Sequence, residues 1–161
     1  MEPATWETCR ADFAFDGALI DLQVPNSGQA EWDMFWSALR VGPFKLFGYR
    51  DGEPHQLPET LAEILVECEV AAVMVSVQSG GITANVHFGF AGGELELDID
   101  PREVVNESAF EAVLAVMKFV AAAVRLAVYA TAEGGSVLYA FLRVTPDGQA
   151  VLLPEGSVRR D

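Results

Sequence analysis

The sequence is poor in cysteine and histidine. It has two cysteines, Cys9 and Cys68, and two histidines, His55 and His87, among 161 residues. The cysteines stand far apart, outside any C-x-x-C motif and without a histidine at metal-ligand spacing, which argues against a zinc site. Two free thiols of a cytosolic protein are the simplest interpretation, and the fold needs no disulfide.

Several functional signatures are missing. The sequence has no G-x-G-x-x-G motif and no P-loop, so dinucleotide and nucleoside-triphosphate sites lack their fingerprints and no cofactor is predicted. The first residues, MEPATWETCRADF, contain acids and lack the basic and then apolar layout of a signal peptide. We therefore expect a cytoplasmic protein.

No long hydrophobic run is free of charge. The best candidate for a membrane span, residues 112–130, contains Lys118 and Arg125, each of which would cost about 2.5–3.5 kcal/mol at the bilayer centre. Glu111, Lys118 and Arg125 are seven residues apart, on one face of a helix. A buried helix with a narrow polar stripe is predicted, and no membrane contact.

Positive charge is scarce. Ten Lys and Arg stand against twenty-four Asp and Glu, for a net charge of −14. Such a surface repels phosphate backbones and anionic membranes, which disfavours nucleic acid as a partner, and it attracts cations or a basic protein. The alternative is that the acidity only aids solubility.

What is present predicts a single α+β domain over residues 1–161. Half of the residues are hydrophobic, as in a packed globular chain, and Asp-Gly and Gly-Gly pairs suggest hairpins. We expect a mostly antiparallel sheet of about eight or nine strands, with one long and two shorter helices on one face. Helices are predicted at 29–41, 59–67 and 107–125. Strands are predicted at 11–15, 18–24, 44–50, 126–131, 136–144 and 149–153, and as a central meander at 69–78, 82–91 and 94–100.

The last strand of the meander carries an alternating row of acids: Glu94, Glu96, Asp98 and Asp100. Because side chains alternate between the faces of a strand, these four share one face and Leu95, Leu97 and Ile99 the other. A two-residue turn at Gly92-Gly93 would place His87 opposite Asp98, Asn85 opposite Asp100, and Phe88 and Phe90 in the core. The Gly80-Gly81 turn would set Met74 beside His87 and Ser76 beside Asn85.

Four interpretations of this face stay open. It could be a docking surface for a basic partner, formed by Glu94, Glu96, Asp98, Asp100 and His87, with Phe47 and Tyr49 as aromatic anchors. It could be a hydrolytic site with Ser76 as nucleophile, His87 as base and Asp98 orienting it. It could hold a divalent cation, although alternate residues on a strand are about 6.6 Å apart and share an ion poorly. It could be a solvated sheet face. We assign no catalytic residue and no metal ligand.

The run from Val86 to Val104, VHFGFAGGELELDIDPREV, resembles a pattern in small, acidic, uncharacterised bacterial α+β families of the immunity-protein kind. The similarity is carried by His87, Phe88, Phe90, Asp98, Asp100, Pro101, Arg102 and Glu103. It implies a binding role and transfers no catalytic residue. We therefore expect a protein-binding module that docks a basic partner. The alternatives are a small hydrolase or metal-dependent enzyme using His87 and Asp98, and a structural homo-oligomer.

Overall fold

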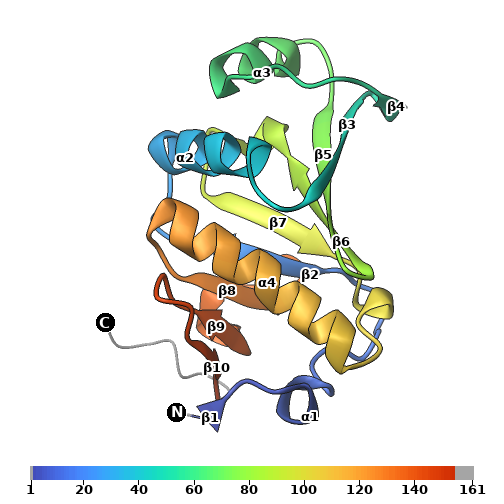
Figure 1. Cartoon of the computed structure of the whole chain (residues 1–161), viewed down its shortest axis with the longest axis vertical. Coiled ribbons are helices and arrows are strands. Elements are labelled where there is room, and N and C mark those ends of the chain that lie inside the picture. The colour runs from blue at the N-terminus through green and yellow to red at the C-terminus, as the bar shows by residue number, and fades with distance from the viewer. Residues whose placement is uncertain (1, 155–161) are drawn as a thin grey trace.

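The computed structural model describes residues 2–154. They form one antiparallel sheet of ten strands in the order β1-β10-β9-β8-β2-β7-β6-β5-β3-β4, with α2 and α4 lying across one face (Figure 1). The predicted α+β class is confirmed. The strands are β1 (Glu2–Pro3), β2 (Ile20–Val24), β3 (Lys45–Arg50), β4 (Glu53–Pro54), β5 (Val73–Ser79), β6 (Ile82–His87), β7 (Leu95–Ile99), β8 (Val128–Ala132), β9 (Leu142–Val144) and β10 (Ala150–Leu152).

Within the described residues, four α-helices accompany the sheet: α1 (Trp6–Cys9), α2 (Gln29–Arg40), α3 (Leu61–Cys68) and α4 (Glu107–Val124). Short 3-10 turns occur at Phe88–Phe90, Pro101–Glu103 and Val137–Tyr139. The long helix is capped by Asn106, whose side chain accepts a hydrogen bond from the N–H of Ala109 at 2.9 Å. It ends where Arg125 takes a left-handed conformation (φ 60°). Glu111, Lys118 and Arg125 are exposed, which confirms the polar stripe. None of the described helices is long and apolar enough to span a bilayer.

The core lies between the sheet and the helices. The inward residues of the central strands, such as Leu22, Val86 and Leu97, are almost completely buried against α2 and α4. Phe88 is packed at 5.3 Å from the ring of Trp36 and at 6.0 Å from that of Trp32, both on α2. The apolar stripe of this helix is therefore core, as its helical spacing favours.

Three predictions of secondary structure are wrong. Residues 11–15 form no strand; Phe13 instead packs its ring against Phe110 and Phe141. Ile20–Val24 therefore has no hairpin partner beside it in sequence and pairs in the sheet centre with β7 and β8. The expected strand 136–144 is reduced to Leu142–Val144, and that at 82–91 ends at His87, because 3-10 turns take up the remainder.

Both sheet edges are short. The outermost strands, β1 and β4, have two residues each, and each includes a proline, Pro3 or Pro54. Proline has no N–H to donate to a further strand, and short edges limit pairing between sheets. Edge-to-edge pairing of two copies through these strands would gain few hydrogen bonds.

Candidate functional site

The polar face of the sheet, opposite α2 and α4, carries a continuous row of side chains across six strands. In order, directly paired residues are Phe47 (β3), Ser76 (β5), Asn85 (β6), Asp98 (β7), Asp21 (β2) and Thr131 (β8). Met74 and His87 are also directly paired. The pairings of Met74 with His87 and of Ser76 with Asn85 are as predicted from the Gly80-Gly81 turn.

The register of the next hairpin differs from the prediction by two residues. Asp98 lies opposite Asn85, whereas His87 was expected there. The cause is the reversal itself: the 3-10 turn Phe88–Phe90 follows β6 directly, so Gly92-Gly93 is not the tip of a two-residue turn. A shift of two keeps each residue on its predicted face. Phe90, however, leaves the core and is 64% exposed.

A chain of hydrogen bonds links four of these side chains. The hydroxyl of Ser76 donates to Oδ1 of Asn85 at 2.8 Å, and Nδ2 of Asn85 donates to Oδ1 of Asp98 at 3.1 Å. Nε2 of His87 lies 3.0 Å from Oδ2 of Asp98. The predicted contact between His87 and Asp98 therefore exists, as a diagonal contact.

This order of contacts does not reproduce a catalytic triad. In a triad the histidine stands between the nucleophile and the acid. Here Ser76 is buried and bonded to Asn85, while His87 lies at the far end of the chain beyond Asp98. Within residues 2–154, no three His, Cys, Asp or Glu side chains are grouped so as to hold a metal ion.

The four acids of the predicted row have different surroundings. Glu94 Oε1 accepts the backbone N–H of Asn26 at 2.9 Å. Asp100 caps the turn at Pro101 and accepts the side chain of Arg102 through both oxygens, the shortest contact being 2.7 Å. The Arg102 hydrogen bond lowers the pKa of Asp100. Glu96 is exposed and Asp98 is largely covered. Asp100 thus has a local cationic partner, whereas Glu94 and Glu96 are the exposed acids of the row.

Asp21 belongs to the site and was missed by sequence reasoning. It is 5% exposed and lies directly opposite Asp98, while Gln23, two residues on, lies opposite Glu96. The backbone N–H of Gly134 donates to Asp21 Oδ2 at 2.7 Å. The alternation in ALIDLQV predicts the face of Asp21. The pairing of β2 with a strand more than seventy residues away leaves no local signal in the sequence.

Two carboxylates of this face, Asp21 and Glu96, have a raised pKa. Burial is the largest cause of the raised pKa of Asp21, and the charges of Asp98 and Glu133 add to it, while the Gly134 hydrogen bond opposes it. Partial burial raises the pKa of Glu96, with further contributions from Asp21, Asp98 and Glu94. The charge of His87 lowers it. The face is therefore a site of unbalanced negative potential.

An open hollow adjoins Glu96. It is lined by Gly89, Phe90, Gly92, Gly93, Glu94 and Glu96. The indole N–H of Trp32 donates to the carbonyl of Gly93 at 3.0 Å and fixes this loop to α2. The ring of Phe90 lies 6.2 Å from that of His87. The predicted anchors Phe47 and Tyr49 are less open, and Lys45 covers the ring of Phe47 at 5.1 Å.

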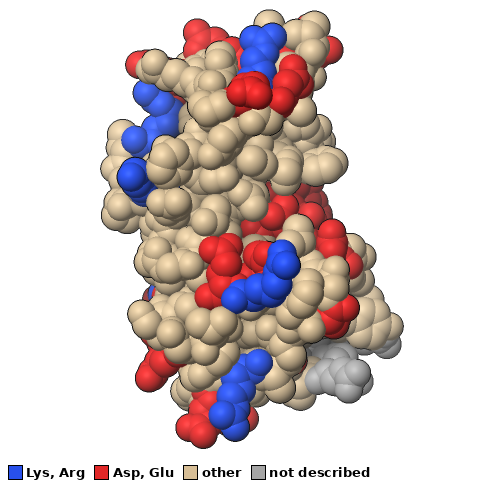
Figure 2. Space-filling view, turned by 90° about the vertical axis from the view of Figure 1, so that its right-hand side faces the viewer, with Lys and Arg blue, Asp and Glu red and all other residues tan. Residues whose placement is uncertain are grey.

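Acidic side chains gather in several groups on the side of the molecule shown in Figure 2, one of them set in a recess at mid-height. Most of the basic side chains in this view lie next to acids.

No family model, no curated protein and no solved structure matches the chain. Function is therefore inferred from the geometry and charge of the site.

Proposed function

We propose that this protein is a binding module, of the immunity-protein kind, that docks a basic protein partner on the polar face of the sheet. We call the four carboxylates Asp21, Glu94, Glu96 and Asp98 the acidic face. The observation that carries the proposal is the close grouping of these carboxylates, with Asp21 directly opposite Asp98 and Glu96 two residues from Asp98 on the same face of the strand. Their mutual repulsion adds to burial, the larger cause, in raising the pKa of Asp21 and of Glu96. A Lys or Arg side chain of a partner would relieve that repulsion, so the partner gains more here than at an isolated surface acid.

The surroundings of Glu96 supply the other parts of an interface. Phe90 offers an exposed aromatic ring beside the hollow, the type of residue that anchors protein interfaces. A partner's guanidinium or ammonium group over the face of Phe90 would add a cation–π attraction. The glycines at 89, 92 and 93 add no side chains to the hollow, so a partner can approach the backbone closely there.

The site is held on a rigid support. Glu96 and Asp98 stand on a strand at the centre of the sheet, paired with β2 on one side and with β6 on the other at Asp98. The loop beside them is fixed by Trp32 through its hydrogen bond to Gly93. Little ordering is then required on association, which favours affinity.

Affinity capture from a lysate of the source organism tests the proposal. Three resins carry the wild type, Glu94→Gln/Glu96→Gln, and a control, Glu69→Gln/Glu111→Gln. The control loses the same charge from exposed positions outside the acidic face, at the end of α3 and on α4. We expect a basic protein to be retained at low salt by the wild type and the control, released as salt is raised, and lost from the first variant.

Equal retention on all three resins would show that only overall charge attracts such proteins, and would refute a specific acidic face. Retention of no basic protein by the wild type at low salt would also count against the proposal. The captured protein should then bind the isolated wild type in a defined ratio, measured by titration calorimetry. Its association rate should fall as salt is raised.

A further inference from the structure

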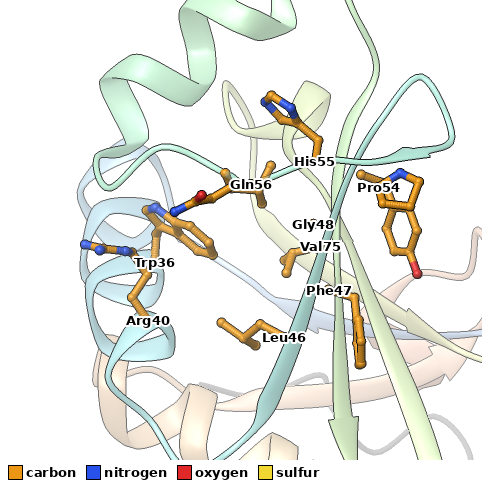
Figure 3. Close-up of a pocket in the computed structure, with 11 residues that line it drawn as sticks. Trp36, Arg40, Leu46, Phe47, Gly48, Pro54, His55, Gln56 and Val75 are labelled. Atoms are coloured by element: carbon orange, nitrogen blue, oxygen red, sulfur yellow. The ribbon is translucent and has the colours of Figure 1, made fainter.

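A separate cavity of about 620 Å³ opens at the other end of the sheet, beside β3. Its size is typical of small-molecule sites. The residues that line it are Trp36, Arg40, Leu46, Phe47, Gly48, Tyr49, Pro54, His55, Gln56, Leu57 and Val75. Figure 3 shows Trp36 and Arg40 from α2 on one side, Gln56 above, and Leu46 projecting from β3 below.

The cavity arises because the chain after β4 leaves the sheet. β3 pairs with β5 along its whole length, but with β4 only at Tyr49 and Arg50. One further hydrogen bond holds the chain after β4 to β3: the N–H of His55 donates to the carbonyl of Gly48 at 2.9 Å. Gly48 permits this approach, since a Cβ there would come within 2.7 Å of Leu57 Cγ. Beyond this point the segment 56–60 turns away to α3.

The open part of the β3 edge is short. β4 pairs only with Tyr49 and Arg50, and Gly48 bonds to His55 beyond β4, so Lys45, Leu46 and Phe47 have a hydrogen-bonded strand on one side alone. Backbone groups of alternate residues point to the same edge, so the N–H and C=O of Leu46 face the same way as the Gly48 carbonyl. Three residues offer only a short edge for an added strand, and the cavity beside them has the size of a small-molecule site.

The loop over the cavity is held by contacts from α2 and α3. The indole N–H of Trp36 donates to the carbonyl of Pro58 at 3.2 Å, and Arg40 donates to the carbonyl of Glu59 at 3.2 Å. Nε2 of His55 lies 3.1 Å from a carboxylate oxygen of Glu67, and its ring is turned away from the cavity (Figure 3). These bonds preform the site before a ligand arrives.

The charge of the lining is opposite to that of the protein. Among the described residues, no Asp or Glu lines the cavity, although the chain has twenty-four, while the guanidinium of Arg40 does. Trp36, Leu46, Leu57 and Val75 supply apolar walls. Nη2 of Arg40 lies 3.5 Å from Oε1 of Glu59, whose side chain is 80% exposed. Exposed ion pairs are weak, so the guanidinium can exchange Glu59 for a ligand at little cost.

We propose that this cavity binds a small monocarboxylate with an apolar, ring-sized body. The body packs against Trp36 and the aliphatic walls, and the carboxylate takes the guanidinium of Arg40. The Leu46 backbone and the Gln56 amide offer further hydrogen bonds at the rim. Because the net charge repels anions at long range, affinity comes from these local contacts, and we expect a Kd on the order of 100 µM for a two-ring probe.

Titration with three probes tests the proposal: naphthalene-2-carboxylate, 2-naphthalenemethanol and 2-naphthylmethylamine. Binding is measured by calorimetry and by the shift of the Trp36 indole N–H signal in NMR spectra. The carboxylate should bind at least ten-fold more tightly than the other two. Arg40→Gln should weaken carboxylate binding about ten-fold and alcohol binding much less, since the alcohol loses only the bond from Arg40 that holds the loop. Glu59→Gln should tighten it about two- to five-fold, because it removes the competing carboxylate. Lys118→Gln, which removes a charge from α4, should change the affinity for neither the carboxylate nor the alcohol.

Leu46→Trp fills the cavity and should abolish binding of all three probes while the protein remains folded. Equal affinity for the alcohol and the carboxylate, or no effect of Arg40→Gln, would overturn the proposed ligand class. Absence of saturable carboxylate binding at about 1 mM would overturn the site itself. The substitutions at Arg40 and Glu59 are at the exposed rim, so they test the proposal even if Leu46→Trp fails to fold.

Discussion

Replacing Asp21 by Asn should make this protein more stable at neutral pH. Asp21 is buried and directly opposite Asp98, so two carboxylates face each other across neighbouring strands. Asn keeps an oxygen that can accept the N–H of Gly134, which now donates to Asp21 at 2.7 Å. The substitution therefore removes the repulsion and preserves the contact with the loop.

The magnitude follows from the geometry. Directly opposed side chains have Cβ atoms about 5 Å apart, and two like charges at about 6 Å repel by about 2.8 kcal/mol at an effective dielectric constant of about 20. A hydrogen bond to a neutral oxygen is about 1 kcal/mol weaker than one to a carboxylate. The net gain at pH 7 is then about 1–2 kcal/mol, or a rise in Tm of several degrees for a domain of this size.

The gain must depend on pH. The folded-state pKa of Asp21 is raised above its unfolded value, so the folded protein binds this proton more readily. The wild type consequently becomes more stable as pH falls through the folded pKa toward the unfolded value, and the penalty is complete only above the folded pKa. The Asp21→Asn variant has no such titrating group, so its advantage should be full near pH 7 and vanish near pH 4.

Urea denaturation followed by tryptophan fluorescence, at pH 7 and pH 4, measures this difference. Asp33→Asn, on the exposed side of α2, is the charge-matched control and should change stability by less than about 0.5 kcal/mol. A variant destabilised at pH 7 would show that the Gly134 bond outweighs the repulsion. An equal gain at both pH values would refute the assignment to the charge of Asp21.

Three further outcomes are expected. Phe88→Ala should lower the free energy of unfolding by about 3–5 kcal/mol in urea denaturation, because Phe88 is fully buried, whereas Phe90→Ala, at an exposed ring, should lower it by less than about 0.5 kcal/mol. Asn106→Ala should lower Tm through loss of about 1 kcal/mol of helix capping, and Asn106→Asp should retain most of it, as calorimetry would show. Glu96→Lys should slow association with a captured basic partner by about ten-fold in low-salt stopped-flow experiments and much less at high salt; an unchanged rate would remove Glu96 from the docking surface.

The central meander was predictable because its signals are local. Alternating apolar residues mark β5, β6 and β7, and the tight Gly80-Gly81 reversal fixes the pairing of Ser76 with Asn85. The two-residue error in the next hairpin arose because the 3-10 turn at Phe88–Phe90 has no clear sequence signature. The faces of His87 and Asp98 were nevertheless right, since side chains repeat every two residues.

The parts that could not be predicted depend on long-range pairing. β2 lies between β7 and β8, so Asp21 meets Asp98 only after the chain has folded across the whole sheet. The alternation of ADFAF is typical of a strand, yet Phe13 is buried between Phe110 and Phe141 without one. The cavity beside β3 depends on the departure of residues 56–60 from the edge, which no motif in the loop indicates.

The two proposed sites should bind their ligands almost independently. The salt dependence of any coupling between them shows whether that coupling is electrostatic. Phe47 lines the cavity on β3, and Ser76, Asn85 and Asp98 follow it across the sheet, so β3 and β7 are three strand spacings, about 14 Å, apart. Interactions between exposed charges are largely screened beyond about 8 Å at physiological ionic strength, but only beyond about 30 Å at 0.01 M.

Glu96→Lys should therefore tighten naphthalene-2-carboxylate binding measurably at low salt and by less than about two-fold at physiological salt, with calorimetry as the measurement. At physiological salt, the effects of Arg40→Gln and Glu96→Lys on the free energy of carboxylate binding should add in the double variant. A coupling that persisted there could not be carried by the field of the acidic face. It would have to pass through the packed row from Phe47 to Asp98, and occupation of the cavity would then regulate docking.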